Sequence, residues 1–185
     1  MHQYQFLDFR HDEEAALSRL VELLKRSTEP APAGLPLPKV FLCHAKEDAQ
    51  RVEGLYFSLR DRGLDPWYDK EKLLVGDDWE REILTAIEQS DFFAVFLSNT
   101  SSKKTGFIQK EIKTAVREYQ RRPEGFAYLL PIKLEECEIP DIKLDDNKRL
   151  ENLHWAELFE DDYKAIDRLA KAILTQWRRK LQRQE

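Results

Sequence analysis

Six consecutive apolar residues at positions 92–97, FFAVFL, constrain the fold of this chain more than any other part of its sequence. A strand with one face in water alternates apolar and polar residues, whereas this run is apolar on both faces. It lies between two longer segments that have the spacing of amphipathic helices. A short strand buried on both faces and flanked by helices is typical of the centre of a parallel α/β sheet.

The same alternation of strand and helix continues along the rest of the chain. It predicts strands at 39–43, 64–68, 92–97, 126–132 and near 153–155, and helices at 47–62, after 77, at 106–120 and at 161–181. Parallel strands of one sheet are joined by crossover helices, so the pattern predicts a parallel sheet covered by helices on both faces.

Local signals predict where two of these helices end or begin. Gly63 is expected to stop the helix at 47–62. Asp77, with Glu80 three residues later, resembles a capping box at the start of the next helix. One face of that helix carries the apolar residues Trp79, Ile83, Ala86 and Ile87.

The N-terminal part differs in character from the rest. Residues 1–28 are expected to contain a short amphipathic helix, because Leu17, Leu20, Val21 and Leu24 share one helical face. Residues 29–38 hold four of the eight prolines and predict an extended, semi-rigid linker. The α/β domain is therefore expected to span 39–181.

Composition excludes several classes of function. The net charge of −5 disfavours nucleic acid and anionic membranes as partners, although a local basic patch could still bind a phosphate. No apolar run approaches the roughly 20 residues that span a bilayer, and the N-terminus does not resemble a signal peptide. Cys43 and Cys137 match no metal-ligand spacing, so we expect no metal site and two reduced thiols in a cytoplasmic protein.

The position of a ligand site follows from the expected sheet. Open α/β sheets bind ligands beyond the carboxyl ends of their strands, where the strand order reverses. In a flavodoxin-like order that point lies between the first and third strands. The segments to consider are therefore His44-Ala45-Lys46, the residues from Ser98 onward, and 69–76 after the second strand.

Glu111 is the most informative single residue. On the helix at 106–120 it lies beside the apolar stripe formed by Ile108, Ile112, Ala115, Val116 and Tyr119, and no basic residue stands three or four positions away. Such a carboxylate can be half-buried and face a cleft. Most charged residues are solvated, however, so its spacing alone leaves a surface role open.

Other candidates are weaker. A lone histidine at a strand end, such as His44, is more often structural than catalytic. Ser98, Ser101 and Ser102 lack the G-x-S-x-G context of a nucleophilic serine. Neither a Walker loop nor a G-x-G-x-x-G motif is present, so no common nucleotide fingerprint applies.

Five segments in order resemble the TIR (Toll/interleukin-1 receptor) domain family, in particular its bacterial members. KVFLCHAKED at 39–48 is similar to box 1, and WYDKEKLLVGDDW at 67–79 to the second strand and the BB loop. SDFFAVFLS at 90–98 is similar to the third strand, and FIQKEIKTA at 107–115 to the helix that carries the family's glutamate. His154-Trp155 fits an aromatic box near the last strand.

The resemblance implies a flavodoxin-like, three-layer domain with a five-stranded parallel sheet in the order 2-1-3-4-5. It also implies cleavage of NAD⁺ at the nicotinamide–ribose bond, with Glu111 catalytic and NAD⁺ as a substrate, so that no cofactor is expected. By the same resemblance, the residues that hold NAD⁺ would be His44, Ala45, Lys46, Asp69, Leu74, Gly76 and Phe107. Phe107 stands where the family often has tryptophan.

The chemistry suits a single carboxylate. Nicotinamide leaves as a neutral molecule and needs no general acid, while an anion near the ribose favours its developing positive charge. Water attack gives ADP-ribose and internal attack a cyclic product, and the sequence does not decide between them. Family members of this kind self-associate through the BB loop, which implies TIR–TIR contacts, a downstream effector or regulatory subunit, and a role in bacterial immune or antiphage signalling.

Three alternative functions are compatible with an α/β domain of this kind or share its fold. A non-enzymatic TIR adaptor would act through protein contacts alone. A phosphoacceptor receiver domain would need an aspartate at the end of the third strand, where this chain has Leu97-Ser98-Asn99. A nucleoside deoxyribosyltransferase would act on nucleosides and leave NAD⁺ intact.

Overall fold

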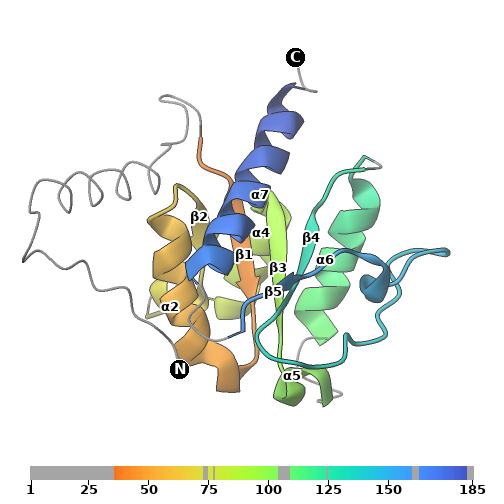
Figure 1. Cartoon of the computed structure of the whole chain (residues 1–185), viewed down its shortest axis with the longest axis horizontal. Coiled ribbons are helices and arrows are strands. Elements are labelled where there is room, and N and C mark those ends of the chain that lie inside the picture. Colours follow the sequence, from red (N-terminus) through yellow and green to blue (C-terminus); the bar gives the residue numbers. More distant parts are fainter. Residues whose placement is uncertain are drawn as a thin grey trace, which may run out of the picture.

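A computed structural model describes residues 36–72, 75–76, 78–103, 109–123, 125–159 and 163–182, and these form a five-stranded sheet with helices on both faces (Figure 1). All paired strands run parallel. The strands are β1 (Lys39–Cys43), β2 (Asp65–Trp67), β3 (Phe92–Leu97), β4 (Leu129–Lys133) and β5 (Ala156–Glu157). Their order, β2-β1-β3-β4-β5, confirms the flavodoxin-like order predicted from the sequence.

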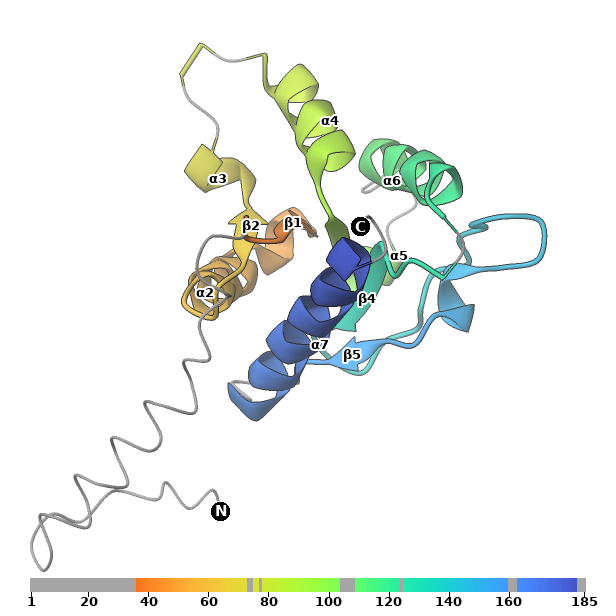
Figure 2. The ribbon, with the colours of Figure 1, turned by 90° about the horizontal axis from the view of Figure 1, so that it is seen from above.

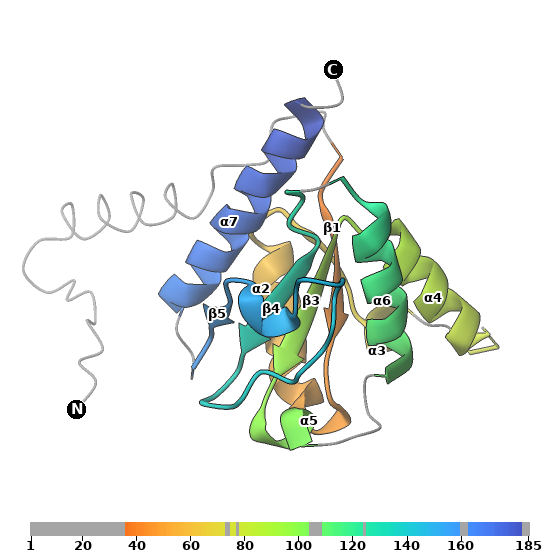
Figure 3. The same ribbon diagram turned by 90° about the vertical axis from the view of Figure 1, so that its right-hand side faces the viewer.

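The helices form one layer on each side of the sheet (Figures 2 and 3). One layer consists of α2 (Ala49–Arg60) and α7 (Tyr163–Gln182), and the other of α4 (Trp79–Gln89) and α6 (Gln109–Arg121). Shorter helical segments are η1 (Lys46–Asp48), α3 (Asp69–Lys72), α5 (Asn99–Lys103) and η2 (Leu150–Asn152). The sheet therefore has a hydrophobic core on each face.

The central strand β3 divides its side chains between these two cores. Phe92, Ala94 and Phe96 pack on the side of α2 and α7, whereas Phe93, Val95 and Leu97 pack on the side of α4 and α6. All six residues are buried, which confirms the prediction from the unbroken apolar run.

Two local signals in the sequence, Gly63 and the capping box predicted at Asp77, can be compared with the observed ends of α2 and α4. Gly63 adopts φ of 78°, a conformation that glycine tolerates without strain, and it follows α2 as predicted. The cap of α4 is Asp78 rather than the predicted Asp77, which lies outside the described residues: the Asp78 side chain accepts a hydrogen bond of 3.3 Å from the backbone N–H of Arg81. The expected pairing of Asp77 with Glu80 was therefore wrong by one position.

Trp79 also departs from the expected pattern. It shares a face of α4 with Ile83, Ala86 and Ile87, yet 61% of it is exposed. Ile87 is fully buried, whereas Trp79 lies in the first turn of α4, at the end that points away from the sheet in Figure 2. Helical periodicity gives the direction of a side chain but not the distance of its turn from the core.

The helix predicted at 106–120 is observed as α6, and its predicted start falls in 104–108, outside the described part of the chain. Two other boundaries were misplaced. Strand β4 begins at Leu129 rather than at 126, after a turn in which the N–H of Phe126 bonds the carbonyl of Pro123. Strand β5 follows the buried Leu150 and its helical turn, so it starts at Ala156 instead of near 153. The short α5 was not predicted.

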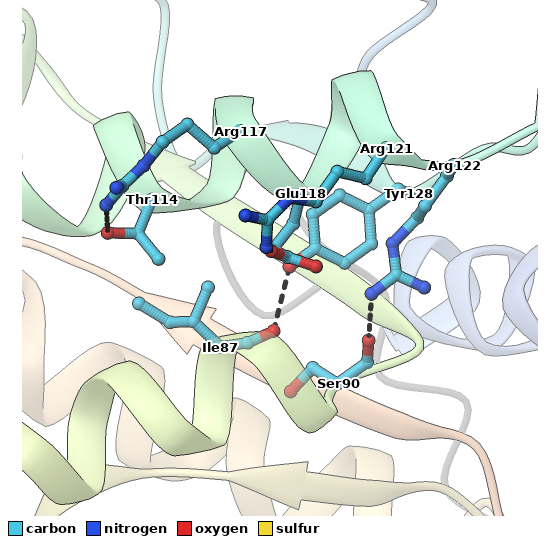
Figure 4. A network of polar contacts seen from close by, with 8 residues as sticks. All are labelled: Ile87, Ser90, Thr114, Arg117, Glu118, Arg121, Arg122 and Tyr128. Atoms are coloured by element: carbon cyan, nitrogen blue, oxygen red, sulfur yellow. Dashed lines mark hydrogen bonds and ion pairs between the residues drawn. The ribbon is translucent and has the colours of Figure 1, made fainter.

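A polar network joins α4, α6 and β4 at the amino end of the sheet (Figure 4). The phenol of the buried Tyr128 donates a hydrogen bond of 2.9 Å to the carbonyl of Ile87. The Arg122 guanidinium lies 4.0 Å from the centre of the Tyr128 ring and donates a bond of 2.8 Å to the carbonyl of Ser90. Carbonyl groups at the end of α4 thus receive the partners that a helix terminus requires.

The N-terminal segment predicted as a helix, at 1–28, and most of the linker at 29–38 lie outside the described residues. The described chain begins at Pro36, whose carbonyl accepts a bond of 3.2 Å from the indole N–H of Trp177. Both cysteines are buried free thiols. None of the described helices has the length and apolar character needed to cross a membrane.

Candidate functional site

The chain segments that follow β1 and β3 lead to helices on opposite faces of the sheet. After Cys43 the chain passes through η1 into α2, and after Leu97 it passes through α5 toward α6. Because β1 and β3 are neighbours, this divergence marks the position at which open α/β sheets bind ligands. The structure therefore brings the segment after His44 and the segment after Ser98 to one edge, as predicted.

Ser98 and Asp48 join the two segments across this edge. The Ser98 hydroxyl donates a hydrogen bond of 2.8 Å to a carboxylate oxygen of Asp48. The Ser98 oxygen also accepts a bond of 3.1 Å from the N–H of Ser101, and both serines are 4% exposed. These buried serines therefore have a structural role, because they hold the segments after β1 and β3 together.

Sequence reasoning missed Asp48. Burial raises the pKa of its carboxyl, and the hydrogen bond from Ser98 opposes that rise. The nearby carboxylates of Glu135 and Glu47 raise the pKa further, while His44 lowers it. The signal that could have revealed Asp48 is its place one turn after the end of β1, on the short η1 helix.

His44, Ala45 and Lys46 form the loop directly after β1. The His44 Nδ1 lies 3.1 Å from the carbonyl of Leu42, and its ring centre lies 5.3 Å from that of Tyr68. Ala45 is fully buried, so it can offer a ligand only its backbone, whereas Lys46 is exposed. The loop thus combines an oriented imidazole with an accessible cation.

Glu111 lies in the first turn of α6 and is half-buried. Burial raises the pKa of the Cys43 thiol, and the Glu111 carboxylate adds to that rise. Since Cys43 is the last residue of β1, the carboxylate acts at the carboxyl end of that strand. Among the described residues, none forms a hydrogen bond or an ion pair with Glu111. Its carboxylate is therefore available to a ligand at the edge where β1 and β3 diverge.

The family follows from comparison with known proteins. Residues 40–170, more than two thirds of the chain, match the TIR domain family. This chain belongs to the TIR domain family. The resemblance noted in its five motifs is thereby confirmed.

Curated TIR relatives match the central part of the chain. An NAD⁺ hydrolase of Theionarchaea archaeon is 35% identical over 94 residues, which cover 50% of this chain and 27% of the relative. An NAD⁺ hydrolase of Paracoccus denitrificans is 33% identical over 64% of this chain and 40% of its own length. A 2′ cyclic ADP-D-ribose synthase of Bacteroides thetaiotaomicron is 30% identical over 57% of this chain and 36% of its own length. The chain thus spans less than half the length of these relatives.

Solved structures agree on the fold. The TIR domain of a Toll-related receptor from Hydra magnipapillata superimposes with a TM-score of 0.50 at 21% identity, covering 72% of this chain and 96% of that domain. A TIR–STING receptor from C. gigas gives a TM-score of 0.54 at 20% identity, covering 72% of this chain and 38% of the receptor. At such identities the likeness concerns the fold alone.

The remaining predicted residues come from the segment after β2 and from the start of α6. Asp69 opens α3 next to Tyr68, whose ring contacts His44, so it lies on the same side of the TIR domain as the β1 loop. Gly76 is exposed and has φ of 101°. Leu74 and Phe107 lie outside the described residues.

Two cavities of this TIR domain lie away from Glu111. One of about 850 Å³ is bounded by α7, β4 and the segment around Trp155, and one of about 550 Å³ lies between Arg122 and Lys180. Neither is lined by His44, Asp69 or Glu111. Cavity volume therefore points to a different part of the sheet from the site predicted by the chemistry of the side chains.

Proposed function

We propose that this TIR domain cleaves NAD⁺ at the bond between nicotinamide and ribose, with Glu111 as the catalytic carboxylate. The observation that carries the proposal is the placement of Glu111. It is half-buried, acts electrostatically on Cys43 at the end of β1, and has no ion pair or hydrogen bond among the described residues. Such a carboxylate can interact with a positive charge that develops in a ligand.

The reaction needs an anion that stabilises the positive charge on the ribose and a nucleophile that accepts the ribosyl group. When the C–N bond breaks, its electron pair stays on the pyridinium nitrogen and nicotinamide leaves as a neutral molecule. The ribose carbon becomes an oxocarbenium ion, which the Glu111 carboxylate stabilises. Water then adds to that carbon and releases a proton, which yields ADP-ribose. An internal nucleophile of the same molecule would instead give a cyclic product.

The loops at the same edge would hold the rest of the dinucleotide. Lys46 is an exposed cation that suits a phosphate, and His44 has an imidazole oriented by the Leu42 carbonyl. Asp69 and Gly76 belong to the segment that follows β2. We assign Leu74 and Phe107 to the same role from the family resemblance, together with the backbone of Ala45.

The names of the relatives support the reaction class. Two are NAD⁺ hydrolases and one is a cyclic ADP-D-ribose synthase, so they include both outcomes of the same bond cleavage. By the same likeness we place the protein in cytoplasmic immune signalling of a bacterial type, with a downstream effector or regulatory subunit as its partner.

We also propose that the domain associates with other copies of itself. Val75 is fully exposed, and 61% of Trp79 is exposed. Both lie in or beside the segment that resembles the BB loop, and large apolar side chains on a surface favour protein contacts. We therefore propose that the site works in a TIR–TIR assembly. A purely adaptor function would use the same contacts without chemistry.

One experiment distinguishes these functions. The full chain is incubated with NAD⁺, and the products are separated by chromatography and mass spectrometry. Release of nicotinamide with ADP-ribose indicates hydrolysis, and release with a cyclic isomer indicates cyclisation. NAD⁺ that remains intact over a wide range of protein concentrations, including the assembled form, would favour the adaptor function.

A further inference from the structure

A groove lies beside α7 at the β4 edge of the sheet, where the two-residue β5 pairs only with Ile132 and Lys133 of β4. We call it the α7–β4 groove. It forms the cavity of about 850 Å³, and its apolar lining includes Leu130, Leu153, Trp155, Leu169, Ala172 and Ile173. Because apolar area in water is unfavourable, a groove of this kind favours a covering partner.

The topology explains why the groove is open. The connection from β4 to β5 packs on the α4/α6 side of the sheet, through residues such as Leu144 and Leu150, so α7 alone covers β4 on the α2/α7 side. Consequently Leu130, in the middle of β4, is only partly buried, whereas every residue of β3 is buried. Trp155 is likewise 38% exposed.

The chain reaches the domain beside this groove. The carbonyl of Pro36 accepts a hydrogen bond from the indole of Trp177, and the neighbouring Gln176 lines the groove. Pro36 is therefore held at Trp177, a residue of α7 that lies within one helical turn of the groove residues Ile173 and Gln176.

The preceding sequence has the pattern of a partner for such a groove. Leu17, Leu20, Val21 and Leu24 form one apolar helical stripe. The nine residues at 27–35 can extend over about 28 Å at roughly 3.1 Å per residue, which is ample for the stripe to turn back onto α7.

The charges of the two parts are complementary. The residues that line the α7–β4 groove and the adjoining smaller cavity include five lysines and arginines, Arg122, Lys148, Arg168, Arg179 and Lys180, and one acidic residue, Glu157. Lys180 is paired with Asp91 at 2.6 Å, and the remaining basic residues still outnumber Glu157. The segment at 1–35 carries six acidic and four basic residues. The net charges of opposite sign favour association and help to orient it.

We propose that the amphipathic segment around 12–26 binds the α7–β4 groove of its own chain through Leu17, Leu20, Val21 and Leu24. The interaction is intramolecular. It lies away from Glu111, which does not line the groove. It is separate from the proposed NAD⁺ cleavage and does not depend on it.

Limited trypsin digestion of the full chain tests this contact, because Arg19, Lys25 and Arg26 are cleavage sites inside the segment. The double variant Leu20→Ser/Leu24→Ser removes apolar contacts without adding charge. We expect its cleavage at these sites to be at least about tenfold faster than in the wild type, since a docked helix must first detach. The matched control Ala15→Ser/Glu22→Ser lowers helix propensity on the opposite face and should keep the wild-type rate.

The groove side is tested with Ala172→Trp, which fills the groove from an exposed position. We expect this variant to melt cooperatively and yet to lose the protection of Arg19, Lys25 and Arg26. The proposal is overturned if cleavage is equally fast in the wild type and the Leu20/Leu24 variant, or if Ala172→Trp leaves the protection unchanged. Protection that disappears on dilution would also overturn it and would assign the groove to a second copy of the chain.

Discussion

The Ser98 hydroxyl donates a hydrogen bond of 2.8 Å to the Asp48 carboxylate, although the two residues are 50 positions apart. The bond connects the loop after β1 to the loop after β3 at the edge where the two strands diverge. It stabilises a carboxylate whose pKa is raised by burial and by the charge of Glu135. The hydrogen bond from Ser98 therefore favours the ionised form of Asp48, whereas burial disfavours it.

Ser98→Ala should therefore destabilise the fold by about 1–2 kcal/mol at pH 7, because it removes the donor to Asp48 and the acceptor for the Ser101 N–H. A carboxyl whose pKa is raised by folding lowers stability as pH rises through that pKa. Removing Ser98 raises the pKa further. We expect the loss of stability to be larger at pH 7 than at pH 4, as measured by urea unfolding.

Ser102→Ala is the control for this prediction. Its hydroxyl donates to the carbonyl of Glu138 at an exposed site of the same region. We expect a change within about 0.5 kcal/mol, since water can replace that bond. A Ser98→Ala variant as stable as the wild type at both pH values would contradict the role given to the Ser98–Asp48 bond.

Tyr128→Phe isolates a single buried hydrogen bond in the network of Figure 4. The phenol of Tyr128 bonds the carbonyl of Ile87, whereas Arg122 contacts the ring and should keep that contact in phenylalanine. We expect a loss of about 1 kcal/mol in the free energy of unfolding at pH 7. The measurement is chemical denaturation followed by circular dichroism.

The same substitution has a distinct pH dependence. Burial raises the pKa of Tyr128 above its usual value, so the wild type loses stability as pH rises beyond about 10, the usual pKa of an exposed tyrosine. Phenylalanine does not titrate, and the difference between the two proteins should shrink above that pH. Arg121→Ala, which removes the exposed partner of the largely buried Glu118, should change stability by less than about 1 kcal/mol. A difference that grows at alkaline pH would contradict the assignment.

The fold was largely predictable from the sequence because its strongest signals are local. The unbroken apolar run at 92–97 identified β3, and the half-buried position of Glu111 followed from the helical spacing of its neighbours. Periodicity carries information over one or two turns, and both features depend on that range alone.

Features that depend on distant partners were not predictable in this way. The role of Asp48 comes from a bond to a residue 50 positions away, and its place shortly after β1 is the one local signal that points to it. The exposure of Trp79 depends on where the first turn of α4 lies relative to the sheet. The cap at Asp78 was missed because two adjacent aspartates, Asp77 and Asp78, offered the same chemistry.

Gly76 gives a prediction about assembly. Its φ of 101° is disfavoured for other residues, although no atom lies within 4 Å of the position of a Cβ. Gly76→Pro requires φ near −65° and so changes the loop that resembles the BB loop. We expect NAD⁺ cleavage to fall by about tenfold or more, and wild-type activity per molecule to rise with protein concentration. The assay is nicotinamide release over a dilution series.

Gly54→Ala is the matched control, because Gly54 also has open space around it but lies inside α2. Alanine favours a helix interior, so this variant should gain about 0.5–1 kcal/mol of stability and keep its activity. Wild-type activity per molecule that stays constant from dilute to concentrated protein would exclude assembly as a requirement.

Glu111→Gln should abolish most NAD⁺ cleavage while leaving the fold intact. Glutamine keeps the shape of the side chain but removes the charge, and the loss of a group that stabilises a developing cation lowers the rate by about a hundredfold or more. Stability should change by less than about 0.5 kcal/mol, since no described residue pairs with Glu111. The measurements are nicotinamide release at saturating NAD⁺ and a thermal melt of both proteins.

Glu118→Gln provides the control, two helical turns along α6 from Glu111. Glu118 pairs with Arg121 at 2.7 Å and lies beside Tyr128 (Figure 4). Its substitution should leave the cleavage rate unchanged and weaken only the ion pair with Arg121. Near-wild-type turnover in Glu111→Gln would make that carboxylate a surface group and favour the adaptor function. An unfolded Glu111→Gln variant would instead show that the carboxylate is structural, against the catalytic role proposed for it.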